Sequence, residues 1–145
     1  MVNAKTREKK GGSGPCGKRC KLCRHMKKTD TVKDKDGKER RLESKMDCRT
    51  VGAIYGMYCR KCKKVVYVGK TKNRIMERFN GHRADLKMAD ENKPAFHFRK
   101  DGHKEEDMEV IGLEHVPGAD DVYRIARECW WMSRMGTLEE ENRKR

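Results

Sequence analysis

Two short segments, each carrying a tyrosine, constrain the fold of this chain more than any other feature. Residues 51–58 and 65–69 are rich in β-branched and aromatic side chains, which is typical of β-strands. Only residues 59–64 separate them, so we expect two neighbouring strands joined by a short turn. The first strand carries Tyr55 and the second carries Tyr67.

The second half of the chain predicts two longer helices and a third strand. Residues 72–88 and residues 119–135 place apolar side chains at helical spacing. In the second segment, Asp120 is a favourable N-cap residue for the helix. Residues 93–100 predict a short helix, and residues 108–116 are apolar enough for a strand. The expected fold class is α/β (α+β): a small three-stranded antiparallel sheet flanked by helices, with a zinc-stabilised N-terminal arm.

The charge distribution favours a polyanionic partner. The chain has a net charge of +14, and residues 60–87 alone hold ten lysines and arginines against two acidic residues. The positive charge therefore coincides with the second tyrosine strand and the helix after it. Phosphate contacts from such a surface supply affinity that does not depend on nucleic-acid sequence. The alternative is a basic surface that is merely solvated.

The N-terminal third is too polar to fold on its own. Charged residues make up 41% of the chain and hydrophobic residues 34%, against about 25% charged in an ordinary domain. Residues 1–15 predict a flexible basic tail. Residues 16–50 form a cysteine-rich arm, in which Asp36-Gly37 indicates a hairpin turn within a ribbon at 29–43. With so little apolar surface, the arm needs another source of stability.

We expect the cysteines to bind metal rather than form disulfides. No apolar run approaches 18 residues and no secretory leader is seen, so we expect no membrane contact and a reducing, intracellular environment. Two sets have the spacing of zinc ligands: Cys59, Cys62, His97 and His103, and Cys16, Cys20, Cys23 and Cys48, where His25 could replace one cysteine. The alternatives are reduced turn cysteines with surface histidines, and a basic arm with an empty site. Cys129 lies among apolar residues and is expected in the core.

The helix after the tyrosines carries two groups suited to a phosphate. Arg78 and His82 are four residues apart, so they share one helix face. Phosphodiester hydrolysis needs an activated water, a cation on the nonbridging oxygens and relief of charge on the leaving oxygen. Glu128 lies beside apolar residues, where a carboxylate is costly to bury without a use. The alternative is that Tyr55 and Tyr67 are ordinary strand aromatics and that His82 and Glu128 are solvated helix residues.

In this order the motifs resemble the GIY-YIG nuclease superfamily, and most of all the endonuclease domain of Penelope-like retroelements. The resemblance lies in Ala53-Ile54-Tyr55, Cys59-x2-Cys62, Tyr67-Val68-Gly69-Lys70-Thr71, Arg78-Phe79-Asn80-Gly81-His82-Arg83, His97-x5-His103, Glu128-x2-Trp131 and the upstream Cys16-x3-Cys20-x2-Cys23. It implies that Tyr55 and Tyr67 lie side by side and that one of them orients or deprotonates the attacking water. It also implies that Arg78 binds the phosphate, that His82 contacts the phosphate or assists proton transfer, and that Glu128 binds a Mg²⁺ or Mn²⁺ ion. Asn142 resembles a phosphate-contacting asparagine of the family. The sequence departs from the pattern at Ala53, which replaces the first glycine, and at residues 139–141, which lack the turn expected before Asn142.

The resemblance implies a GIY-YIG endonuclease domain at 51–138, followed by a charged tail at 139–145. Its activity would be metal-dependent nicking of DNA in the nucleus, where the nick primes reverse transcription, with element RNA and a reverse transcriptase as further partners. The residues expected to contact the DNA backbone are Lys70, Lys72, Arg74 and Arg83. Two other interpretations stay open: a zinc-containing nucleic-acid-binding module without catalysis, and a zinc-nucleated protein-interaction domain.

Overall fold

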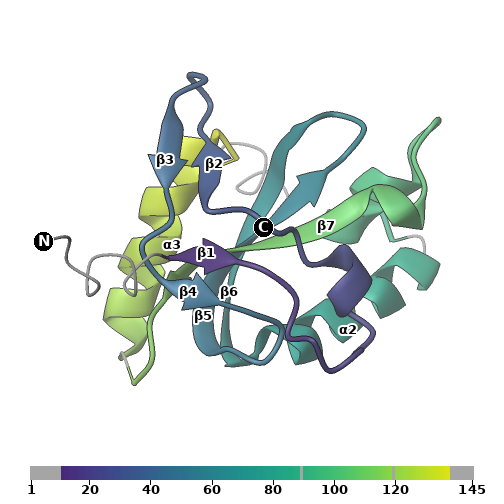
Figure 1. Ribbon diagram of the computed structural model, residues 1–145. Helices are drawn as coiled ribbons and strands as arrows, with labels where there is room; N and C mark the ends of the chain where they lie inside the picture. Colours follow the sequence, from purple (N-terminus) through teal and green to yellow (C-terminus); the bar gives the residue numbers. More distant parts are fainter. Residues whose placement is uncertain (1–10, 89, 119, 138–145) are drawn as a thin grey trace, which may run out of the picture.

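A three-stranded antiparallel sheet lies at the centre of the molecule (Figure 1). The computed structural model describes residues 11–88, 90–118 and 120–137. The strands are β5 (Val51–Cys59), β6 (Lys64–Arg74) and β7 (Met108–His115), in the order β6-β5-β7. Helices α2 (Ile75–Met88) and α3 (Asp121–Met135) accompany the sheet, with short 3-10 helices η1 (Cys23–His25), η2 (Pro94–Arg99) and η3 (Glu105–Asp107). The mixed α/β architecture confirms the predicted three-stranded antiparallel sheet and its accompanying helices.

Element boundaries differ from the prediction mainly at the start of α2. Strand β6 continues to Arg74, which pairs with Val51, so α2 begins at Ile75 rather than at residue 72. The extension is polar, and backbone pairing with β5 holds it in the sheet where composition gave no indication of a strand. Helix α3 begins as predicted behind Asp120, whose carboxylate accepts a hydrogen bond from the Tyr123 amide at 2.8 Å.

The central strand β5 is buried on both faces of the sheet, and its side chains point alternately to the two faces. Tyr55 and Met57 pack in one hydrophobic cluster with Phe79 of α2. Ile54 packs in a second cluster with Trp131 of α3. Each helix therefore covers its own face, and the nearly continuous apolar run of β5 follows from its central place.

The N-terminal arm is part of this core and does not form an appendage. Leu22, Met26 and Cys48 are buried in the same cluster as Phe79. The predicted ribbon is the hairpin of β2 (Thr31–Lys33) and β3 (Glu39–Arg41), with Gly37 at a φ of 81° in its turn. Figure 1 shows this hairpin beside α3.

The hairpin is fastened to α3 through Trp130. The guanidinium carbons of Arg127, Arg134 and Arg40 lie 4.6, 4.9 and 5.4 Å from the centre of a Trp130 ring. The amide of Lys35 also donates to the Arg134 carbonyl at 2.9 Å. The arm thus reaches both faces of the sheet, through its buried side chains on the α2 side and its hairpin on the α3 side.

The prediction of a flexible tail through residue 15 is wrong for its last residues. Strand β1 (Gly12–Ser13) pairs in parallel with β4 (Lys45–Met46). The Ser13 hydroxyl also accepts a hydrogen bond from the Gly112 amide of β7 at 3.0 Å. Residues 1–10 lie outside the described residues. None of the described helices is long and apolar enough to cross a membrane.

The orientation of α3 differs from the one its apolar residues suggested. Cys129, predicted in the core, is exposed, and Val122 retains 78% of its accessible surface. The buried side of the helix instead includes Arg124 and Glu128. These charged side chains are buried because they form ion pairs, with Asp121 and Lys70 respectively. Helical spacing alone does not reveal such pairing.

Candidate active site

Four of the side chains expected at the phosphodiester lie together on the α2 face of the sheet. The rings of Tyr55, Tyr67 and His82 form a triangle with centroid distances of 6.4, 5.8 and 5.7 Å. The Tyr55 hydroxyl and His82 Nε2 are hydrogen-bonded at 2.7 Å. Arg78 acts on the same hydroxyl, because it lowers the pKa of Tyr55 against the effect of burial. Strands β5 and β6 supply the tyrosines, and one face of α2 supplies Arg78 and His82.

Two glycines make room for this cluster. Gly69 lies opposite Tyr55 in the β5–β6 register, and a Cβ there would lie 2.7 Å from the Tyr55 hydroxyl oxygen and 2.7 Å from the Tyr67 ring. At Gly81 a Cβ would lie 2.8 Å from Arg78 Nη1. The Tyr55 ring therefore lies over Gly69, and the Arg78 guanidinium lies against α2 at Gly81.

We expect Gly69→Ala to destabilise the fold by about 1–3 kcal/mol, because both tyrosine rings must move to admit a methyl group. The matched control is Gly56→Ala, another buried glycine of the same sheet. Its Cβ would meet only ends of side chains, Val65 at 3.2 Å and Leu113 at 3.4 Å. Urea unfolding of both variants measures the difference. Equal destabilisation would contradict the close tyrosine packing.

Burial sets the protonation of the two hydrogen-bonded groups. The pKa of Tyr55 lies well above its ordinary value because of burial, and the charges of Tyr67 and Glu128 raise it further, although Arg78 opposes them. Burial, and secondarily the charge of Arg78, lowers the pKa of His82 from 6.5 to about 3. At neutral pH, Tyr55 therefore keeps its proton, and His82 is a neutral imidazole.

The histidine predicts a specific loss of stability in acid. The pKa of His82 is about 3 in the fold and 6.5 as its ordinary value, so the unfolded chain binds the extra proton between these pH values. The contribution of His82 is complete above pH 6.5 and declines as the pH falls toward 3, by about 1.4 kcal/mol per pH unit. We expect urea unfolding of His82→Asn, which does not titrate, to be less pH-dependent over this window. An unchanged pH slope would contradict the buried neutral imidazole.

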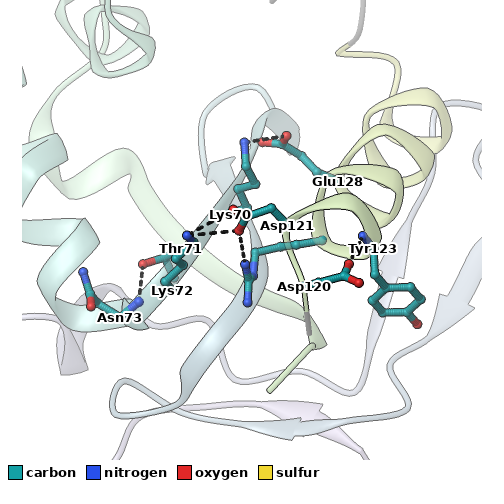
Figure 2. Close-up of polar contacts among 9 residues, drawn as sticks. Lys70, Thr71, Lys72, Asn73, Asp120, Asp121, Tyr123 and Glu128 are labelled. Atoms are coloured by element: carbon teal, nitrogen blue, oxygen red, sulfur yellow. Dashed lines mark hydrogen bonds and ion pairs between the residues drawn. The ribbon is translucent and has the colours of Figure 1, made fainter. Parts of the chain in front are cut away.

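Glu128 approaches the same region from the other side of β6. Its carboxylate is 4% exposed and forms an ion pair with Lys70 Nζ at 3.2 Å (Figure 2). Lys70 pairs in register with Ile54, whose side chain faces α3. The Glu128 charge nevertheless contributes to the raised pKa of Tyr55. The predicted residues therefore lie on both sides of the edge strand, next to Gly69, while Asn142 lies outside the described residues.

Three of the four cations expected to contact DNA are ion-paired within the protein. Lys70 meets Glu128 as above, Lys72 Nζ lies 3.0 Å from Asp121, and Arg83 Nε lies 3.2 Å from Glu105. Arg74 is exposed. Acidic residues of η3 and α3 therefore moderate the positive charge that the sequence concentrates in residues 60–87.

The first predicted ligand set comes together between the β5–β6 turn and η2. Cys59, Cys62, His97 and His103 place one ligand atom each within 4.8 Å of one another. Cys62 Sγ lies 3.6 Å from His97 Nε2 and 3.4 Å from His103 Nε2. Zinc bonds of about 2.3 Å to sulfur and 2.0–2.1 Å to nitrogen give a tetrahedral edge of about 3.5 Å. His103 Nδ1 contacts the Asp101 carbonyl at 3.3 Å, which leaves Nε2 available for a metal.

The second set comes together in the arm. Cys16, Cys20, Cys23 and Cys48 also place their sulfur atoms within 4.8 Å, and the closest pairs are 3.5–3.9 Å apart. A tetrahedral zinc site has sulfur atoms about 3.8 Å apart. Burial opposes ionisation of Cys23, but hydrogen bonds from Cys20, from Cys16 and from the backbone outweigh it and lower the pKa of that thiol to about 6. Both clusters could hold a metal ion, and both are compatible with structural zinc.

Comparison with known proteins adds no relative. No family model, no curated protein and no solved structure matches this chain. Sequence reasoning did not anticipate the space made by Gly81 or the pairing of Lys70 with Glu128. The pairing depends on which surface α3 presents to β6. Gly81, by contrast, lies three residues after Arg78 on the same helix, and the sequence shows it only as an isolated glycine within that helix.

Proposed function

We propose that this chain is a metal-dependent DNA endonuclease of the GIY-YIG type that nicks one strand, as in retroelements whose nick primes reverse transcription. The observation that carries the proposal is the convergence of Tyr55, Tyr67, Arg78 and His82 around Gly69, with Glu128 across the same edge strand. A protein that only bound nucleic acid would have no need of a buried neutral histidine in contact with a buried tyrosine.

The two tyrosines have different roles in this proposal. Tyr55 is buried and holds its proton firmly, so it positions His82 and Arg78. Tyr67 is only partly buried, and its ring borders the cluster. It therefore orients the attacking water and takes its proton, while the phenolic proton of Tyr67 passes to a phosphate oxygen of the substrate. Arg78 binds the nonbridging oxygens through its planar guanidinium.

Glu128 supplies the carboxylate for a divalent ion. The buried carboxylate offers oxygen atoms, which are the ligands that Mg²⁺ prefers. Bound there, the ion would relieve negative charge on the scissile phosphate. The two cysteine-containing clusters hold structural zinc, which stabilises the turn after β5 and the arm. DNA as the substrate implies a nuclear site of action.

A plasmid-nicking assay with Mg²⁺ or Mn²⁺ tests the proposal and the division of roles. We expect Tyr67→Phe to lower the nicking rate by about 10²–10⁴-fold, as for loss of a general base. Tyr55→Phe should lower it less than tenfold while costing about 1–3 kcal/mol of stability, because it leaves a buried group of His82 unpaired. Tyr58→Phe, on the same strand as Tyr55, is the control and should nick normally. A Tyr67→Phe protein with full activity would refute the assigned base.

The second candidate is a zinc-containing nucleic-acid-binding module without catalysis. The paired metal clusters and the net charge of +14 favour it. Salt-sensitive DNA binding by the wild-type protein, without nicking in either metal, would select this alternative. Absence of salt-sensitive DNA binding would instead favour the protein-interaction domain.

A further inference from the structure

The ion pair between Lys70 and Glu128 joins β6 to α3 at the proposed metal site. The glutamate side chain is 4% exposed, whereas the lysine side chain is 39% exposed. Figure 2 shows the lysine reaching from the strand to the carboxylate on the helix. An acidic group buried to this degree needs a cation beside it, and here an ammonium provides the positive charge that a metal would otherwise supply.

We propose that Lys70 and the divalent ion compete for Glu128, so that metal loading releases the Lys70 ammonium to bind a substrate phosphate. This inference rests on the proposed function. It assigns Lys70 a role in coupling metal binding to DNA binding, beyond the backbone contact expected from its charge.

Competition follows from distances and charge. The ammonium lies 3.2 Å from Glu128 Oε1, whereas Mg²⁺ binds carboxylate oxygens at about 2.0–2.1 Å. Both cations at that oxygen would be a few ångströms apart, and a doubly charged ion repels an ammonium twice as strongly as another ammonium does. Lysine can move away, because its compact charge is on a flexible four-carbon stem.

The surroundings of Lys70 favour a phosphate as its next partner. The acidic residue two turns before Glu128 on α3, Asp121, already lies 3.0 Å from both Lys72 and Arg124. The Lys70 stem is partly exposed on the edge strand, next to Gly69 and the tyrosine cluster. A released ammonium on this flexible stem can therefore turn outward to a DNA phosphate that passes the edge strand.

Coupling must act in both directions. If metal binding frees Lys70 for DNA, then a DNA phosphate that attracts Lys70 must tighten metal binding by the same factor. Free protein would then hold its catalytic metal weakly, and DNA would recruit it.

The test measures Mn²⁺ binding to the zinc-loaded, full-length protein by electron paramagnetic resonance, without DNA. We expect Lys70→Met to bind Mn²⁺ about tenfold more tightly than wild type, within the usual range of coupling factors. The matched control is Lys72→Met, which removes the same charge from the same strand but leaves Glu128 paired, and it should bind as wild type. A Lys70→Met protein that binds Mn²⁺ no more tightly than wild type, or no more tightly than Lys72→Met, would overturn the inference.

A second variant keeps the test decisive if Lys70→Met folds poorly. Lys70→Arg retains the charge and can hold the carboxylate with two nitrogens, so we expect it to bind Mn²⁺ more weakly than wild type. Mn²⁺ binding by Lys70→Arg that is tighter than wild type would contradict competition.

The coupling itself is measured through DNA affinity. Fluorescence anisotropy of a labelled duplex, with and without Ca²⁺ at matched ionic strength, should show tighter binding with Ca²⁺ for wild type and little change for Lys70→Met. Equal effects of Ca²⁺ on both proteins would contradict the release of Lys70.

Glu128→Gln separates this inference from the proposed function. If Glu128→Gln loses Mn²⁺ binding but Lys70→Met is unchanged, only the competition is wrong. If Glu128→Gln binds Mn²⁺ as wild type does, the metal site of the proposed function fails, and the inference fails with it.

Discussion

Replacing Glu128 with glutamine should lower Mg²⁺-dependent nicking at least about a thousandfold while the protein stays folded and still binds DNA. Glutamine has the same shape but carries no charge, so the buried position is filled and the proposed metal ligand is lost. Removing a single preorganised electrostatic contact from an active site costs about 10²–10³ in rate, and here a doubly charged ion is lost with it. Plasmid nicking under single-turnover conditions measures the rate, and anisotropy of labelled DNA measures binding.

The matched control is Asp121→Asn, which neutralises an acidic residue on the same helix that also pairs with a lysine of β6. It should nick within about twofold of wild type. Arg78→Ala should behave like Glu128→Gln, since it removes the phosphate ligand. Full activity of Glu128→Gln would refute Glu128 as the metal ligand, and with it the proposed active site.

Replacing Cys48 with serine should unfold the arm and destabilise the sheet with it. Cys48 is fully buried among Leu22, Met26 and Phe79, so its cluster lies inside the shared core. Structural zinc contributes roughly 10–16 kcal/mol of apparent binding energy in zinc-finger peptides, comparable to the whole stability of a typical domain, about 5–15 kcal/mol. Circular dichroism measures the thermal midpoint, and elemental analysis should give about two zinc ions per wild-type chain.

Cys129→Ser is the control for the cysteine change itself. Because Cys129 is exposed and lies outside both clusters, its substitution should alter neither the zinc content nor the thermal midpoint by more than a degree or two. A Cys48→Ser protein that melts like wild type, or a wild-type protein that stays folded after its metal is removed, would show that zinc does not hold this core together.

Local sequence was sufficient to predict the elements whose residues interact with near neighbours. The hairpin turn at Gly37 and the Asp120 N-cap depend on contacts within a few residues, and the strand pair is joined by a short turn. The structure confirms all three. The two ligand sets were also predictable, because metal ligands have a restricted chemistry and spacing. The extension of β6 to Arg74 and the exposure of Cys129 were not predictable from local sequence. Each depends on a surface supplied by a distant part of the chain.

By itself, the sequence determined which chemical groups are present and the order in which they occur: two tyrosines on neighbouring strands, Arg78 and His82 on one helix face, and Cys/His sets with ligand spacing. Only the tertiary structure decided the protonation and the ion pairing of these groups. Packing of α2 and the arm over the sheet buries His82 and lowers its pKa, and the approach of α3 to β6 places Glu128 in contact with Lys70. Burial and charge pairing depend on which surfaces meet, and residues far apart in the chain meet only through the fold.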